Sequence, residues 1–302
     1  MYDINDIPAL KNLGMNIEEF FFFQNKTLYY ELLMLRSKYP SHFVTDIYGY
    51  QLLILERIEK FANSYFFIAK STQNYALVGA LVRVFADYVA GYRLVYLNPN
   101  KEEVLLRHYL YIIDGLQRRI NEISGPLPKM NSVPQQMVDK LNAHIESSCN
   151  CHLHTISVCI EEIKKQSLYK NNSDVIDCLI EQNNWKYREL RKGNKNWYSW
   201  NELYSKLELK GATHFTEFSC FIHGLSTCQL DGVISDEFID KMWGLTTALI
   251  NKTIEAVNLI FDVTKEKQEQ IILQVCKDKE FSKIMKSNDS WNKLIDYISE
   301  IQ

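Results

Sequence analysis

Glycine and proline are scarce in this sequence. The 302 residues contain 11 glycines and 6 prolines, about half of the usual share. Both residues mark turns, so few turns are encoded and the elements between the turns must be long. Long elements are typical of helices, because strands average only about five or six residues. The scarcity of turn residues therefore favours an all-α fold.

The sequence also shows neither a secretion signal nor an apolar membrane span. The segment Met1–Asp6 lacks the basic residues and apolar run of a signal peptide. No uncharged apolar stretch reaches the roughly 18 residues needed to cross a bilayer. The 7 cysteines, all at or beyond Cys149, are odd in number, which favours free thiols. We therefore expect a cytoplasmic protein with no membrane partner.

Several common catalytic signatures are missing. The sequence has no P-loop, no Gly-x-Gly-x-x-Gly and no His-Glu-x-x-His. It also has no Gly-x-Ser-x-Gly nucleophile elbow. These absences disfavour the commonest nucleotide, zinc-protease and hydrolase chemistries without excluding an enzyme. We expect no cofactor, and the net charge of -3 does not by itself indicate an acidic partner.

Helical periodicity runs through the rest of the chain, and no stretch alternates as a strand does. We expect a multi-helix array of long packed helices in a single all-helical domain over residues 1–302, with 124–134 as the alternative internal boundary. Short helices should flank an irregular segment at Trp185–Trp200. The longer helices are predicted at Asn16–Lys38, after Asp46, and at Asn74–Leu97, Lys101–Ile123, Pro134–Gln166, Ala212–Thr227, Asp236–Val263, Lys265–Lys277 and Asn288–Ile301.

Four consecutive phenylalanines, Phe20–Phe23, cover a whole turn of the first predicted helix. A helix that is apolar on all sides is wrapped by other elements. This helix therefore either enters the core or joins a subunit interface, which would make the protein a homodimer.

A cysteine–histidine cluster suggests a metal site at first reading. Cys149 and His152 share one helical face, and Cys151 and His154 share another. The two pairs point in different directions from one helix, so they cannot converge on one tetrahedral ion. We therefore expect no metal at this cluster.

Basic and aromatic residues alternate in the irregular segment, which holds five basic residues and one acid. Such a mixture suits single-stranded nucleic acid, because cations neutralise phosphates and rings stack on bases. The other interpretation is a solvated loop anchored by buried tryptophans. We favour that second interpretation and expect weak nucleic-acid binding or none. The nucleic-acid candidates are Trp185, Lys186, Arg188, Arg191, Lys192 and Trp197.

The third predicted helix has two unusual faces. One is bulky and apolar, whereas the other carries small residues around Arg83 and Asp87. Small residues indicate close approach by another helix or the floor of a cleft. Arg83 and Asp87 are four apart and able to pair, and a charge in a crowded place needs such a partner. The pair is either an internal ion pair or an arginine offered to an anion.

The predicted Ala212–Thr227 helix is divided similarly. Phe218, Phe221 and Ile222 lie on its apolar face, and Ser219 and His223 lie opposite. Ser219 and His223 are four residues apart and can touch. A polar face without charges fits a wet internal pocket or a satisfied core histidine.

These helices and the segment between them carry a series of motifs: Leu81-Val82-Arg83, Trp200-x-x-Leu203, Gly211 and Phe215-x-x-Phe218-Ser219-x-x-Ile222-His223-Gly224. In this order the motifs resemble those of an uncharacterised family of bacterial all-helical proteins, a domain of unknown function. The resemblance covers roughly residues 75 to 230 and implies an all-helical fold. It marks Arg83, Ser219 and His223, while Phe215 stands where the family has tyrosine. Some such proteins are distantly similar to HEPN ribonucleases, which implies RNA-linked or defence roles.

Three functions follow from these patterns. The leading one is a binding or regulatory protein whose polar cleft between the two helices takes an unknown anionic ligand at Arg83, Asp87, Ser219 and His223. The second is an RNA-directed enzyme in which Arg83 and His223, with Ser219, are the catalytic candidates. The third is a structural dimer subunit.

Overall fold

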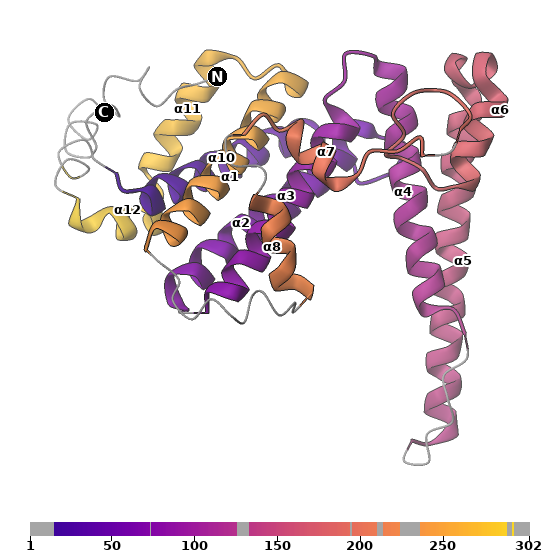
Figure 1. Ribbon diagram of the computed structural model, residues 1–302, viewed down its shortest axis with the longest axis horizontal. Coiled ribbons are helices and arrows are strands. Elements are labelled where there is room, and N and C mark those ends of the chain that lie inside the picture. The colour runs from indigo at the N-terminus through magenta and orange to yellow at the C-terminus, as the bar shows by residue number, and fades with distance from the viewer. Residues whose placement is uncertain are drawn as a thin grey trace. The chain divides into compact units, whose positions relative to one another are not determined.

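The computed structural model describes residues 15–72, 74–125, 133–193, 195–209, 214–223, 236–288 and 292. Within these ranges the chain forms eleven α-helices and one short 3-10 helix, and it forms no strand (Figure 1). The predicted all-α fold class is confirmed. The elements are α1 (Ile17–Lys38), α2 (Ile47–Ser71), α3 (Tyr75–Tyr96), α4 (Lys101–Ile123), α5 (Gln135–Lys165), α6 (Ser167–Glu181), α7 (Trp200–Ser205), α8 (His214–His223), α10 (Asp236–Phe261), α11 (Lys265–Cys276), α12 (Lys279–Ile284) and η2 (Met285–Ser287).

Capping residues explain where several helices begin. Asn16 accepts a hydrogen bond from the backbone of Glu19, whose side chain accepts one in return, and this capping box starts α1. Asn100 caps α4 because its side chain accepts hydrogen bonds from the backbone nitrogens of Glu102 and Glu103. Helix α12 was not predicted, because it is short; it begins at its own cap, Asp278. Most of the helix predicted at Asn288–Ile301 lies outside the described residues.

The chain divides into two compact units. Unit 1 takes its described residues from Met1–Pro40, Gln51–Arg93 and Ser199–Gln302, and unit 2 takes them from Ser41–Tyr50 and Leu94–Tyr198. The segment 124–134, considered above as a boundary, joins two helices within unit 2.

Aromatic side chains fill the core of unit 1, where α1 packs against α10, α11 and α12. Phe21, Phe22 and Phe23 are buried. The ring of Phe21 lies 5.5 Å from that of Trp243, and the ring of Phe22 lies 4.4 Å from that of Phe66. The phenylalanine run therefore enters the core. Three of the four phenylalanines are covered by other parts of unit 1, so their side chains are not available for a dimer interface.

Helix α3 is the one described helix that is long and apolar enough to cross a membrane. Its apolar window is 56% buried inside the protein, and the same helix carries the Arg83–Asp87 ion pair. Both features are typical of a core helix.

Helices α4 and α5 form a two-helix hairpin in unit 2, and they lie side by side in Figure 1. Apolar residues recur every seven positions on α4, at Leu106, Ile113 and Ile120, as in a coiled coil. A row with the same spacing on α5 is Val138, Ile145, His152 and Cys159, of which Val138 and Cys159 are buried and His152 is half-buried. Helix α6 packs on both helices.

Glu31 in unit 1 and His108 in unit 2 are buried side chains whose pKa values are shifted by burial. In unit 1, neither carboxyl oxygen of Glu31 has a hydrogen-bond partner among the described residues, and burial raises its pKa to about 8. In unit 2, His108 is fully buried. Its Nε2 lies 2.8 Å from the carbonyl oxygen of Val44, and its Nδ1 lies 2.9 Å from the hydroxyl of Tyr96. Burial lowers the pKa of His108 to about 4.

Candidate functional site

Helices α3 and α8 meet at Arg83. The Nε of Arg83 donates a hydrogen bond of 3.0 Å to the hydroxyl of Ser219. Both residues belong to unit 1. The prediction that these two helices are neighbours is confirmed, although Ser219 was expected to contact His223 and not Arg83.

Asp87 is the shared acceptor of the site. Arg83 donates from Nη1 to Oδ1 of Asp87, so the predicted pairing of the two residues is confirmed. The hydroxyl of Tyr204 donates to the same oxygen. Two donors thus hold one carboxylate, and we call Arg83, Asp87, Tyr204 and Ser219 the Arg83 site.

Two aromatic rings cover the guanidinium. The Cζ of Arg83 lies 4.7 Å from the ring centroid of Tyr204 and 5.9 Å from that of Trp200, within the range of cation–π attraction. Burial, and then the hydrogen bond to Asp87, raises the pKa of Tyr204 well above its usual range. Sequence reasoning missed Tyr204. The spacing of four between Trp200 and Tyr204, which puts both rings on one helical face, was the available signal.

The small face of α3 is buried in part, since Ala76 is exposed and Ala80 is half-buried, and its contact with α8 differs from the expectation. Gly79, Ala86 and Ala90 are all buried. A Cβ on Gly79 would lie 2.6 Å from the ring of Phe221 and 3.6 Å from that of Phe218. We expected the polar side of α8 here, and that expectation was wrong at Gly79. The two phenylalanine rings reach α3 because a glycine leaves room for them.

His223 is the last residue of α8, but its side chain lies outside the described residues. Its predicted contact with Ser219, and a cleft that it would share with Arg83, stay predictions. The RNA-directed enzyme depends on this imidazole and therefore also stays a prediction.

The Arg83 site is partly exposed. The Arg83 side chain keeps 11% of its surface and that of Asp87 keeps 31%. Nε and Nη1 of Arg83 have acceptors, whereas no described residue accepts a hydrogen bond from Nη2. The site can therefore act as an internal ion pair, and it also has one guanidinium nitrogen left for an anion.

The basic loop, residues 185–198 of unit 2, folds around buried anchors. The indole of Trp185 is buried and donates to Asp114 over 3.0 Å. Tyr187 is also buried, with its ring 3.8 Å from the guanidinium carbon of Arg107. Trp185 was a candidate for stacking on a nucleic-acid base, and that assignment was wrong because its ring is already covered.

The opposite side of the basic loop faces solvent. Trp197 is 48% exposed, so it does not anchor the loop as the favoured interpretation required. The candidates Arg188, Arg191 and Lys192 are exposed, and Lys186 is half-buried. The loop therefore combines one buried and one exposed tryptophan, which sequence reasoning could not separate.

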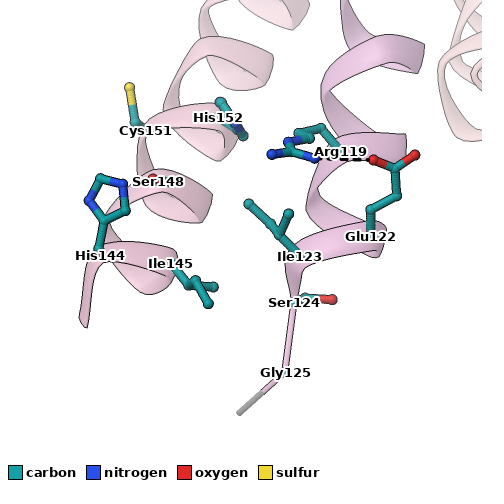
Figure 2. A pocket seen from close by; sticks show the side chains of 10 residues that line it. All are labelled: Arg119, Glu122, Ile123, Ser124, Gly125, His144, Ile145, Ser148, Cys151 and His152. Carbon is teal, nitrogen blue, oxygen red and sulfur yellow. Dashed lines mark hydrogen bonds and ion pairs between the residues drawn. The ribbon is translucent and has the colours of Figure 1, made fainter. Parts of the chain in front are cut away.

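The cysteine–histidine cluster lies on α5, where Cys151 and His152 line an open groove of about 610 Å³ between α4 and α5. Figure 2 shows His152 and Arg119 pointing toward each other across it. His144 also lines the groove. Among the described residues, no group of three or more His, Cys, Asp or Glu side chains is placed to hold a metal ion. The absence of zinc at this cluster stays a prediction for elemental analysis.

The chain was also compared with known proteins. Searches against protein families, curated proteins and solved structures gave no match. The resemblance to a bacterial all-helical family therefore stays a prediction.

Proposed function

We propose that the protein is a binding or regulatory protein, and that its ligand carries an anionic group held at the Arg83 site. The hydrogen bond between Arg83 and Ser219 is the observation that carries this proposal, because it joins polar groups from α3 and α8. Ser219 fixes Nε and Asp87 fixes Nη1. Nη2 would take the anion.

The surroundings of Arg83 support a ligand role. A guanidinium is always charged and presents its donors in a flat fork that fits carboxylate and phosphate. The rings of Tyr204 and Trp200 restrict its motion, so little side-chain freedom is lost on binding. His223 would lie one helical turn beyond Ser219 and would supply a second donor.

A structural role is the second candidate, and a specific observation favours it. Asp87 accepts from both Arg83 and Tyr204, which is the pattern of a satisfied internal network. Removing Arg83 would then leave a partly buried carboxylate without its counter-charge, and would cost about 3 to 5 kcal/mol if the pair behaved as fully buried.

Thermal melts with and without millimolar inorganic phosphate separate the two roles. Arg93, on the same helix, is a matched control because its side chain keeps a similar 14% of its surface and donates to the Lys252 carbonyl. Phosphate should raise the Tm of the wild type and of Arg93→Ala, but not that of Arg83→Ala or Arg83→Lys. Ser219→Ala should weaken the response.

Two outcomes contradict the proposal. If phosphate shifts none of these proteins, and Arg83→Ala alone melts far below the wild type, the structural role is favoured. If the wild type cleaves RNA and both Arg83→Lys and His223→Ala abolish the cleavage, the RNA-directed enzyme is favoured instead.

A further inference from the structure

The basic loop is held in one conformation from inside. Asn196 is buried, and its Oδ1 accepts from the backbone nitrogens of Arg188 and Glu189, each over 3.2 Å. Its Nδ2 donates to the carbonyls of Glu189 and Arg191 over 2.8 and 2.9 Å. One amide side chain therefore connects the two sides of the loop.

A second anchor comes from α4. Arg107 is buried, and its Nη1 donates to the carbonyls of Trp185 and Tyr187 over 3.1 and 3.0 Å. The Tyr198 nitrogen donates to the Lys186 carbonyl over 2.8 Å. The outward side chains thus project from a fixed backbone, and a ligand that binds them need not order the loop first.

Trp197 and Arg188 are neighbours on the outward side. The Nε of Arg188 donates to the Trp197 carbonyl over 3.0 Å, and its guanidinium carbon lies 5.4 Å from the Tyr198 ring. Half of the Trp197 surface is open to solvent. An exposed indole on a fixed backbone can stack on any base, since every base has a π-face.

The loop that carries this indole also carries exposed cations. Arg188, Arg191, Lys192 and Lys195 are exposed. The acids that pair with Arg191 and Lys192 are Glu189 and Asp174, at 3.0 and 3.5 Å. Both pairs are largely exposed, so they contribute little and a phosphate can compete for the cations. The loop is basic although the whole chain carries a net charge of -3.

We propose that the outward side of the basic loop binds single-stranded nucleic acid. One base stacks on Trp197, and the backbone phosphates lie against Arg188, Arg191, Lys192 and Lys195. An acidic peptide would use the same cations but would have no need of an exposed indole. The inference is independent of the proposed function, because it uses no residue of the Arg83 site.

Fluorescence anisotropy of the full-length protein with labelled oligouridine and oligothymidine of about twelve nucleotides tests the proposal. Stacking on one aromatic ring changes the affinity by between roughly 5-fold and 150-fold, so Trp197→Ala should weaken binding by that factor. Trp197→Phe should keep most of it. Phe43→Ala, which removes a 77% exposed ring elsewhere in unit 2, should have no effect.

The salt dependence tests the phosphate contacts separately. Lys192→Gln and Lys195→Gln should each reduce the slope of log affinity against log salt by about 0.7, the value for a single strand. Lys140→Gln removes one exposed charge from α5 and should leave the slope unchanged. Asn196→Ala should weaken binding without changing the net charge, because the loop loses its inner support.

Three results would overturn the proposal. One is no binding to either oligonucleotide at low salt. Another is binding that is unaffected by Trp197→Ala and by both lysine variants. The last is displacement by polyglutamate as effective as displacement by unlabelled oligonucleotide, which would indicate an acidic protein partner.

Discussion

Tyr204 donates its hydroxyl hydrogen bond to Asp87, which lies 117 residues earlier in the chain. The acceptor is the oxygen that Arg83 also uses. This bond joins α7 to α3 and fixes the carboxylate between two donors. The Arg83 site therefore combines residues from α3, α7 and α8, since Ser219 belongs to α8.

Tyr204→Phe should lower the free energy of unfolding by about 1.5 to 3 kcal/mol, because a hydrogen bond to a charged group is lost. Tyr187→Phe is the matched control. The hydroxyl of Tyr187 is buried without a hydrogen-bond partner among the described residues, so its removal should be neutral or stabilising. Urea denaturation measures both. Equal losses in the two variants would contradict the role given to the Tyr204 hydroxyl.

Gly79→Ala should destabilise the protein by about 1 to 3 kcal/mol, because the new methyl group would overlap the ring of Phe221. Gly244→Ala, on α10 of the same unit, meets no atom within 4 Å and should stabilise by about 0.5 to 1 kcal/mol through helix propensity. Thermal melts should therefore shift in opposite directions. A higher Tm for both variants would show that Phe221 does not lie against α3.

The buried carboxyl of Glu31 should make unit 1 less stable as the pH rises from about 4.5 to about 8. In this range the unfolded chain releases the proton, whereas the folded chain keeps it because its pKa is raised to about 8. The native state then binds more protons, so stability falls with pH by at most about 1.4 kcal/mol per unit.

Denaturation at several pH values should show this slope in the wild type and in Glu269→Gln, which changes an exposed carboxyl. The slope should be absent in Glu31→Gln, whose amide stays neutral. A Glu31→Gln variant with the wild-type slope would mean that Glu31 is not protonated in the folded protein.

The buried imidazole of His108 should make unit 2 less stable as the pH falls, which is the opposite of the effect of Glu31. Its folded pKa is lowered to about 4, so its contribution to stability is present above pH 6.5 and is lost as the pH falls toward 4. Histidine NMR should show a neutral ring at pH 5, with the proton on Nε2 directed at Val44. Protonation of this ring near pH 6.5 would contradict its burial.

The sequence predicted the helices well because their signals are local. Caps such as Asn16 and Asn100 and the apolar period lie within a few residues of the structure that they specify. The Arg83–Asp87 pair was predictable for the same reason, since the two residues lie one turn apart on one helix.

Contacts between distant segments were not predictable in this way. Tyr204 contacts Asp87 from another helix, and the residues next to each of them in the sequence do not indicate this contact. Trp185 and Trp197 look alike in the sequence, and the burial of only Trp185 depends on Asp114 and on the path of the loop. The division into two units was not predictable either, because each unit combines segments that lie far apart in the chain.

The two units are built from alternating segments of the chain, and this order has a consequence for protein synthesis. Helix α1 ends at Lys38, whereas α10 and α12, which cover Phe21 and Phe22, begin at Asp236 and Lys279. A nascent chain that has reached Tyr198 contains the whole of unit 2 but presents the phenylalanines of α1 without these partners. Exposed apolar surface of this kind promotes aggregation, and the core of unit 1 can close over these phenylalanines only after α10 and α12 have been synthesised.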